Sequence, residues 1–249
     1  MPVILKSRDE IAIMRQAGRH VAEVLQILAA EVRPGISVLD LDRVVRREFK
    51  QRKVTPTFLG YHGYPATVCV SVNDQIVHGI PRERILEDGD IVSIDLGCTY
   101  RGFVGDSAVT VPCGAVTPEA LQLIKVTEAA LWKGICALRP DVRIGDVGHA
   151  IQSYVEPYGM GVVRDYVGHG VGRAMHEDPQ VPNYGTPGSG KRLKSGTVVA
   201  IEPMVNLGSH ETRRDPDGWT VWTKDGSLSA HFEHTIAVTP DGPEVLTLL

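Results

Sequence analysis

The stretch GDIVSIDLGCTYRGFVGDSAVTV, residues 89–111, decides the fold of this chain because it predicts two strands that pair with each other. Its first β-rich run is Ile91–Leu96 and its second is Phe103–Val111. The short connection between the runs contains Gly97 and Gly102, which is typical of a hairpin. We therefore expect a β-hairpin in this part of the chain.

Each strand of the hairpin carries one aspartate among apolar and small residues, Asp95 in the first and Asp106 in the second. A turn centred between Tyr100 and Arg101 would place these aspartates directly opposite each other, with Cβ atoms about 4.5–5.5 Å apart. Two carboxylates at that distance destabilise the pair unless a cation lies between them. The hairpin therefore predicts a bound cation. The alternative is that both aspartates lie at loop edges with free access to water.

Length and composition are those of an ordinary globular protein. The chain has 249 residues, of which 43% are hydrophobic and 22% charged, so it can form a sizeable buried core. Its net charge of −4 gives no reason to expect nucleic acid or membrane binding, and its apolar runs are too short to span a bilayer. Four cysteines without C-x-x-C spacing fit reduced thiols. We expect a cytoplasmic protein without a secretion signal.

Helices and strands are expected on both sides of the hairpin. Capping residues and apolar periodicity predict the starts of four helices: Ser7 with a capping box to Glu10, Ser37, Thr117 followed by Pro118, and Gly145. An aromatic, glycine-rich stretch, Phe58–Pro65, precedes a predicted strand at Thr67–Val72. Most of the last third of the chain is expected to form strands.

The order of these elements contains an internal duplication. Three pairs of segments match in the same order: RPGISVLDL (33–41) with RPDVRIGDV (139–147), HG (62–63) with HG (169–170), and GDIVSID (89–95) with GTVVAIE (196–202). The repeat predicts an α/β (α+β) fold in which a single domain, residues 1–249, consists of two pseudo-two-fold related halves, roughly 1–112 and 113–249. The functional site is expected where the halves meet.

The duplication predicts a second pair of acids. If Glu202 matches Asp95, its partner should come from a neighbouring strand, and Glu233 in the predicted strand Ser229–Ile236 is the candidate. Four clustered carboxylates cannot all stay ionised without counter-charge, and two divalent cations would cancel their charge. His169, between Gly168 and Gly170, is a candidate nitrogen ligand. Taken singly, each acid could instead cap a turn and His169 could be a loop residue.

The type of ligand indicates the type of metal and its chemistry. Carboxylate oxygens with one imidazole and no thiolate favour Mn, Fe(II) or Co over a structural zinc site. Two such metals about 3.5–4 Å apart generate a hydroxide near neutral pH and polarise a carbonyl. The pattern therefore favours metal-assisted hydrolysis.

Several motifs resemble the type I methionine aminopeptidases of peptidase family M24. They are GHGVGR (168–173) with HE (176–177), IEPM (201–204) and FEHT (232–235), together with the aspartates of the hairpin. The resemblance covers nearly the whole chain and is greatest to the compact bacterial form. It implies the pita-bread fold with a dinuclear metal site, and removal of the initiator methionine from nascent proteins whose second residue is small and uncharged. No helix shows a sustained heptad seam, so a monomer is the default expectation. The ribosome exit region is a further candidate partner.

Carried over to this chain, the resemblance assigns the metal ligands and the catalytic residues. The ligands of two divalent ions (Co, Mn, Fe(II) or Zn) would be Asp95, Asp106, His169, Glu202 and Glu233. Glu202 would also shuttle a proton. His78 would contact the substrate backbone beyond the scissile bond, and His176 would donate to the carbonyl oxygen as negative charge develops on it. Without the resemblance, both histidines would be interpreted as hydrogen-bonded loop residues.

The resemblance also assigns a substrate pocket. The methionine side chain would lie among apolar and aromatic side chains: Tyr61, Tyr64, Cys69, Met175 and Trp219. Met175 departs from the phenylalanine that many relatives carry there, which changes the shape of the pocket but not the reaction. A sodium or potassium site of the family would lie near Asn73, Gln75 and Ser229.

Three other functions fit parts of the pattern. An X-Pro aminopeptidase or prolidase shares the fold but usually carries an additional N-terminal domain, for which the chain before the first helix leaves no room. A metal-free binding module on the same fold would have lost ligands, whereas all five are present. A purely structural cation site would leave His78 and His176 without a role.

Overall fold

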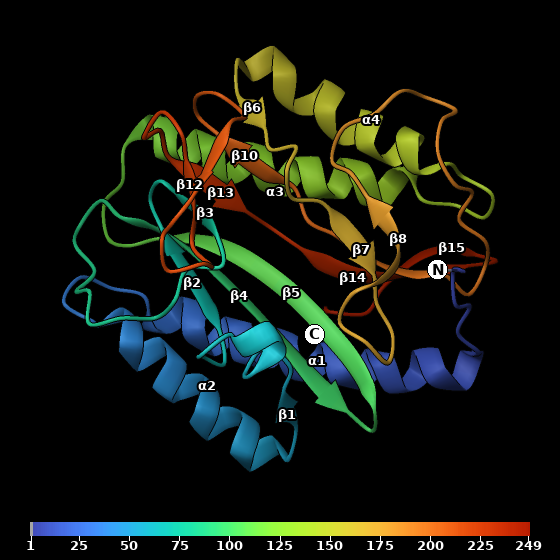
Figure 1. The fold of residues 1–249 in the computed structure, drawn as a ribbon, viewed down its shortest axis with the longest axis horizontal. Coiled ribbons are helices and arrows are strands. Elements are labelled where there is room, and N and C mark those ends of the chain that lie inside the picture. Colours follow the sequence, from blue (N-terminus) through green and yellow to red (C-terminus); the bar gives the residue numbers. More distant parts are fainter. Residues whose placement is uncertain (1) are drawn as a thin grey trace.

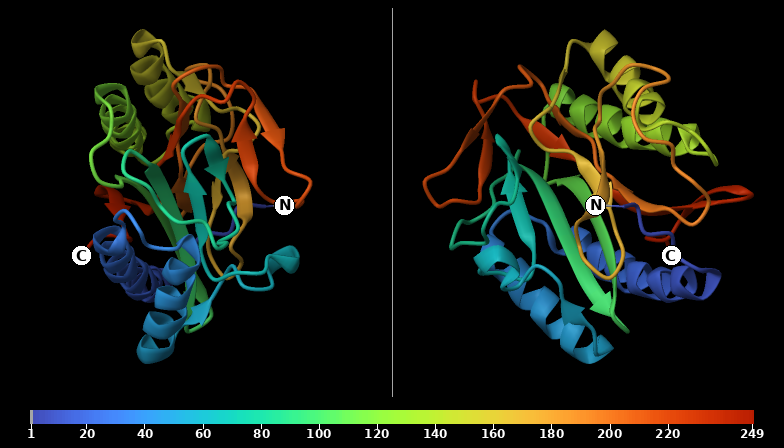
Figure 2. Two further views of the ribbon diagram at one scale, coloured as in Figure 1. Left: turned by 90° about the vertical axis from the view of Figure 1, so that its left-hand side faces the viewer. Right: turned by 45° about the vertical axis from the view of Figure 1, so that its right-hand side comes forward.

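The computed structural model describes residues 2–249 and contains two pairs of helices, one pair below and one pair above a group of twisted sheets in the view of Figure 1 (Figures 1 and 2). The first pair is α1 (Arg8–Glu31) and α2 (Val38–Arg52), and the second is α3 (Pro118–Ala137) and α4 (Ile144–Val155). The predicted fold class, α/β, is confirmed. Within residues 2–249, no helix combines the length and the apolar character needed to cross a membrane.

The helix starts follow from the local sequence. The Ser7 hydroxyl accepts a hydrogen bond from the Glu10 amide, and the Glu10 carboxylate accepts one from the Ser7 amide. The Thr117 hydroxyl accepts from the Ala120 amide at the start of α3, where Pro118 is the first helical residue. The predicted capping interactions are therefore confirmed.

The first sheet is organised around β4 (Ile91–Tyr100), which pairs with β5 (Phe103–Pro112) on one side. On its other side β4 pairs with β2 (Cys69–Val72) and β1 (Thr55–Pro56). Helices α1 and α2 cover this sheet with apolar side chains, so that a continuous core forms between helices and strands. This core gives the hairpin one buried face.

The second sheet has the order β15-β14-β9-β7-β8. Its strands are β7 (Gly168–Gly170), β8 (Glu177–Val181), β9 (Val198–Ile201), β14 (His234–Thr239) and β15 (Gly242–Val245). Helices α3 and α4 pack against this half through a second core cluster. Both halves thus have a helix pair and a sheet, as expected from the duplication. The division of the chain near residue 112 stays a prediction.

Two small sheets and two short helical turns complete the fold. One sheet contains β6 (Gly161–Val162), β10 (Met204–Asn206) and β13 (Ser229–His231), and the other contains β3 (Gln75–Val77), β11 (Thr212–Arg214) and β12 (Val221–Thr223). The 3-10 turns are η1 (Tyr61–Gly63) and η2 (Glu156–Tyr158).

The predicted register of the hairpin is wrong. Tyr100 pairs with Phe103, so the turn consists of Arg101 and Gly102, whose φ angles are 49° and 79°. Positive φ at both central residues is typical of the two-residue turn that matches strand twist. Asp95 consequently faces Ala108, and the two aspartates are diagonal neighbours instead of directly opposite.

Two further expectations need correction. The predicted strand Ser229–Ile236 is two strands, because β13 pairs with β10 and β14 pairs with β9, in different sheets. The match of His62 with His169 is also wrong, since His62 lies in the turn η1 and His169 in β7. The strand of the first half that corresponds to β7 is β2, because β2 pairs antiparallel with β4, which contains Asp95, and β7 pairs antiparallel with β9, which Glu202 follows.

A close approach between backbones joins the hairpin to the first helix. A Cβ atom at Gly105 of β5 would lie 2.6 Å from the Gly18 amide nitrogen of α1. A third core cluster surrounds this contact and includes apolar residues of α1, β5 and the second sheet. The helix therefore packs against β5 at a distance that only glycine permits.

Replacing Gly105 by alanine should destabilise the protein, because the new methyl group requires backbone movement. Overpacking of this kind costs about 1–3 kcal/mol, which denaturant unfolding would show as a lower midpoint. The control Gln16→Ala, on the exposed face of α1, should change the free energy of unfolding by less than about 0.5 kcal/mol. Equal midpoints for the two variants would contradict the prediction.

Candidate metal centre

The hairpin aspartates lie on the same face of the first sheet. Asp106 faces Gly97 across the hairpin, so its carboxylate has room beside it. A Cβ atom at Gly97 would lie 3.2 Å from Asp106 Oδ1 and 3.0 Å from Phe58 Cε1. Asp95 is the diagonal neighbour of Asp106, a position from which side chains can still reach each other. Gly97 therefore leaves space for the carboxylate of Asp106.

Glu202 and Glu233 lie where strand pairs of the second half are interrupted. Glu202 falls between β9 and β10, and Glu233 between β13 and β14. The Glu233 amide donates to the Ala108 carbonyl over 2.9 Å, and the Ala108 amide donates to the Glu233 carbonyl over 3.3 Å. This bridge places an acid of the second half directly beside β5 of the first.

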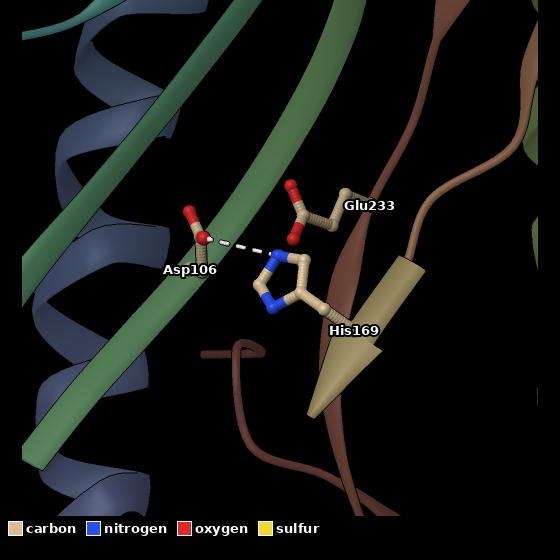
Figure 3. Close-up of side chains that lie close together, drawn as sticks. All are labelled: Asp106, His169 and Glu233. Carbon is tan, nitrogen blue, oxygen red and sulfur yellow. Dashed lines mark ion pairs between the residues drawn. The ribbon is translucent and has the colours of Figure 1, made fainter. Parts of the chain in front are cut away.

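His169, on β7, lies among these carboxylates. Its Nε2 atom is 3.5 Å from Glu202 Oε1 and 3.9 Å from Asp106 Oδ2. Figure 3 shows Asp106, His169 and Glu233 pointing toward one another from separate strands or strand ends. One ligand atom of each lies within 4.8 Å of the others, and all three residues are buried. The structure thus brings the five predicted ligands into one region.

The tautomer of His169 turns a lone pair toward the acids. Its Nδ1–H donates to the Gly170 carbonyl over 2.9 Å, which leaves Nε2 without a hydrogen in the neutral ring. Burial, and then the neighbouring His176, lower the pKa of His169 to about 3. A neutral imidazole cannot form an ion pair or donate from Nε2 to carboxylates. A cation between His169 Nε2 and the carboxylates would bind the imidazole lone pair and neutralise the acids.

The carboxylates themselves need a counter-charge. Burial raises the pKa of Asp106 to about 7. Burial, followed by the charges of the neighbouring acids, also raises the pKa values of Asp95, Glu202 and Glu233. Each acid disfavours ionisation of the others, as expected for carboxylates that share a site.

Unpartnered polar atoms test whether metal ions fit this site. The buried side-chain atoms without a hydrogen-bond partner include Asp95 Oδ1, Asp106 Oδ1, Glu233 Oε1 and His231 Nε2 at this site. A buried polar atom without a partner is costly and rare in folded proteins. Oxygen atoms with one imidazole nitrogen are suitable ligands for Mn, Fe(II) or Co. The residues present therefore fit divalent cations.

An apolar cluster lies beside the carboxylates. It consists of Phe58, Tyr64, Ala66 and Cys69, with Ile80, Met175 and Trp219 packed against it. Cys69 faces Asp95 across β2 and β4, and the rings of Tyr64 and Trp219 are 5.0 Å apart. Four of the five residues predicted to line the methionine pocket thus lie in one cluster next to the acids. The fifth, Tyr61, lies beside His176 instead.

The two predicted catalytic histidines lie near the centre. His176 Nδ1 is 2.6 Å from the Tyr61 hydroxyl, and the ring centroids of His176 and His169 are 4.2 Å apart. The His78 ring contacts Tyr166 edge-on at 5.6 Å. Burial, and then His176, lower the pKa of His78 to about 4, so its imidazole is neutral near neutral pH.

The residues expected near an alkali-metal site already take part in hydrogen bonds. The Ser229 amide donates to the Asn73 carbonyl over 2.9 Å, and the Val72 amide donates to Gln75 Oε1 over 2.8 Å. These bonds place Asn73 and Ser229 side by side. The alkali-metal site stays a prediction.

Two residues of the site were not predicted from the sequence. His231 Nε2 lies 3.8 Å from Glu202 Oε2, and burial, followed by the neighbouring His78, lowers the pKa of His231 to about 3. Asn183 Nδ2 donates to the Glu202 carbonyl over 3.0 Å. The position of His231 two residues before Glu233 was an available signal, because such residues share a face of an extended strand. Asn183 carries no local signal.

Known sequences and structures resemble this chain over its full length. The model of Metallopeptidase family M24 matches residues 12–240. The methionine aminopeptidase of Clostridium perfringens is 50% identical over 247 residues, which are 99% of each chain. Methionine aminopeptidase 1 of Bacillus subtilis is 50% identical over 245 residues, 98% of this chain and 99% of that one.

Solved structures share the fold. The methionine aminopeptidase of Thermotoga maritima has a TM-score of 0.98 and 46% identity, covering 100% of both chains. The prolidase of Pyrococcus horikoshii has a TM-score of 0.76 and 22% identity, covering 98% of this chain and 63% of that one. The second likeness concerns the fold alone.

Removing one acid should make the metal-free protein more stable at neutral pH. The raised pKa of Asp106, about 7, means that the folded chain binds a proton that the unfolded chain releases above about pH 4. Wild type should therefore lose stability relative to Asp106→Asn as the pH rises from about 4 to about 7, by up to about 4 kcal/mol.

Denaturant unfolding after chelator treatment, at pH 5 and at pH 7.5, measures this difference. The buried histidines are common to both proteins, so their opposite pH dependence cancels in the comparison. Adding Mn²⁺ should reverse the order at pH 7.5, because only wild type keeps the full set of acids. A difference that does not change between the two pH values would contradict the prediction.

Proposed function

The chain belongs to metallopeptidase family M24, and we propose that its four clustered carboxylates and His169 hold two divalent cations that serve the removal of N-terminal methionine. It has the pita-bread fold of that family and is a metallo-aminopeptidase that acts on peptides with an N-terminal methionine. The identities of the metals, their number and the role of each residue are the proposed part.

The orientation of His169 is the observation that carries the proposal. A neutral imidazole whose Nε2 lone pair faces buried carboxylates at 3.5 and 3.9 Å has no hydrogen to donate to them. The arrangement is stable with a cation that accepts electron pairs from both sides. Mn, Fe(II), Co and Zn all accept this combination of oxygen and nitrogen ligands.

The cations would supply one part of the chemistry. When bound, a pair of divalent ions lowers the pKa of water toward neutrality and polarises a carbonyl oxygen. Glu202 would contribute the proton transfer. Its Oε1 atom lies toward His169 and its Oε2 atom toward His231. The carboxylate would accept a proton from the attacking water and deliver it to the leaving amide nitrogen.

His176 and His78 would contact the peptide. His176 lies beside His169, so its imidazole can donate to the carbonyl oxygen as negative charge develops there. Its Nδ1 atom is engaged by the Tyr61 hydroxyl, which would leave Nε2 for the substrate. His78, with Tyr166 against its ring, would hold the peptide on the other side of the bond that is cleaved.

The apolar cluster would bind the methionine side chain. Tyr64, Cys69, Met175 and Trp219 offer a flexible apolar lining, which suits an unbranched thioether. A small and uncharged second residue would be required, because the histidines and the carboxylates would leave little space for the second side chain of the peptide. A monomeric state, work near the ribosome exit region and a cytoplasmic location stay predictions.

Peptide cleavage tests the proposed reaction. Chelator-treated protein refilled with Mn, Fe(II) or Co should release methionine from Met-Ala-Ser but not from Met-Leu-Ser. Glu202→Gln should lower kcat by about 10²–10⁴-fold, because the proton acceptor is lost. No release with any metal, although the protein binds two ions per chain, would overturn the assignment, and X-Pro peptides would then be the next substrates.

Replacing His176 by alanine should lower kcat for Met-Ala-Ser by about 10²–10³-fold, the effect of removing one donor to a developing oxyanion. The KM and the number of bound metal ions should change little, because the donor acts mainly in the transition state. The control is His149→Ala, which alters an exposed histidine of α4. Loss of metal instead of kcat would show that His176 is a ligand and not an oxyanion donor.

A further inference from the structure

The loop between β7 and β8, residues 171–176, brings His176 to the metal centre. It contains no regular secondary structure, so contacts with other segments must fix its shape. The Val104 amide of β5 donates to the Gly172 carbonyl over 2.8 Å at the start of the loop. At its other end the loop is supported by Glu177, which directly follows His176.

One carboxylate oxygen of Glu177 closes the turn of this loop. Glu177 Oε1 accepts hydrogen bonds from the Arg173 amide over 2.9 Å and from the Ala174 amide over 3.3 Å. A Cβ atom at Gly172 would lie 2.3 Å from the same oxygen. The carboxylate thus fills the inside of the turn and accepts the amides that face it.

The other oxygen of Glu177 binds Lys6, far away in the sequence. Lys6 Nζ lies 2.6 Å from Glu177 Oε2, and the two side chains are 3% and 9% exposed. Lys6 Nζ also donates to the Ile4 carbonyl, and the Lys6 amide donates to the Gly196 carbonyl beside β9. The lysine is therefore held from both sides when it meets the carboxylate.

A buried ion pair of this kind is not explained by stability. The free energy needed to remove two charges from water is about as large as their electrostatic attraction in the interior. Replacing such a pair by apolar residues is therefore often neutral or stabilising. What such a pair does supply is a short, directed contact between two segments. Here it joins the segment before α1 to the residue that follows His176.

We propose that Lys6 and Glu177 are positioning residues that hold the imidazole of His176 at the substrate carbonyl. This inference rests on the proposed role of His176, and it assigns the Lys6–Glu177 ion pair as the contact that keeps this histidine in place. Neither residue touches the substrate; both act through the 171–176 loop. A displacement of His176 by about 1 Å is sufficient to lower the rate on the order of 10²-fold.

Two single variants and a matched control test the proposal with the metal-loaded enzyme. Lys6→Met removes the ammonium group, and Glu177→Gln removes the charge while keeping an oxygen for the two amides. Each should lower kcat for Met-Ala-Ser by about 10- to 100-fold with little change in KM or in bound metal. The control is Glu48→Gln. Glu48 is about as buried as Glu177 and forms an ion pair with Arg52 within α2, away from the loop, so this variant should leave kcat unchanged.

Amide hydrogen exchange gives a second readout. In both single variants the Arg173 and Ala174 amides should exchange faster, with no change at α2. The double variant Lys6→Met/Glu177→Gln leaves no unpaired charge in the interior and serves if a single variant does not fold. Unchanged kcat and unchanged exchange in folded variants would overturn the proposal.

Combination with His176→Ala separates positioning from general destabilisation. If Lys6 and Glu177 act through His176, then Lys6→Met should lower kcat in wild type but not in the His176→Ala background. Equal losses in both backgrounds would overturn the proposal. If His176→Ala alone leaves kcat unchanged, the proposed role of His176 fails; if it lowers kcat and Lys6→Met does not, only the positioning role fails.

Discussion

The mutual repulsion of buried carboxylates is the constraint on which this structure depends. Asp106 and Glu233 are each 2% exposed, and burial together with neighbouring acids raises the pKa values of the whole set. Such groups remain ionised only with a positive partner. The sheets of both halves enclose this set, so the site exists only in the folded chain. Binding of divalent cations is therefore linked to the stability of the whole domain.

Hydroxyl side chains hold the two halves together at the site. Thr235 Oγ1 donates to the Asp106 carbonyl over 2.7 Å and accepts from the Asp106 amide over 3.1 Å, while Ser107 Oγ donates to the Glu233 carbonyl. These bonds lie next to the bridge between Ala108 of β5 and Glu233 of the second half. Because these hydroxyl groups bond to the backbone of Asp106 and of Glu233, they help to set the distance between the acids of the two halves.

The errors made from the sequence have specific causes. The hairpin was predicted correctly, but its register was not, because the turn type depends on positive φ at both Arg101 and Gly102. The hairpin and the duplication indicated the four acids and His169 as one candidate set, and the resemblance to a known family then assigned them as ligands. Neither the pattern nor the resemblance pointed to His231 or Asn183, whose relation to Glu202 arises only when β9, β10 and β13 come together.

The sequence by itself determined the helix starts, the hairpin and the residues from which a metal centre can be built, because caps, turns and strand propensity depend on groups a few residues apart. Only the tertiary structure decided which atoms face one another. The tautomer of His169, the shifted pKa values and the contact between Lys6 and Glu177 all depend on burial and on segments distant in the chain. Desolvation is a property of the complete packing, and no local stretch of sequence contains it.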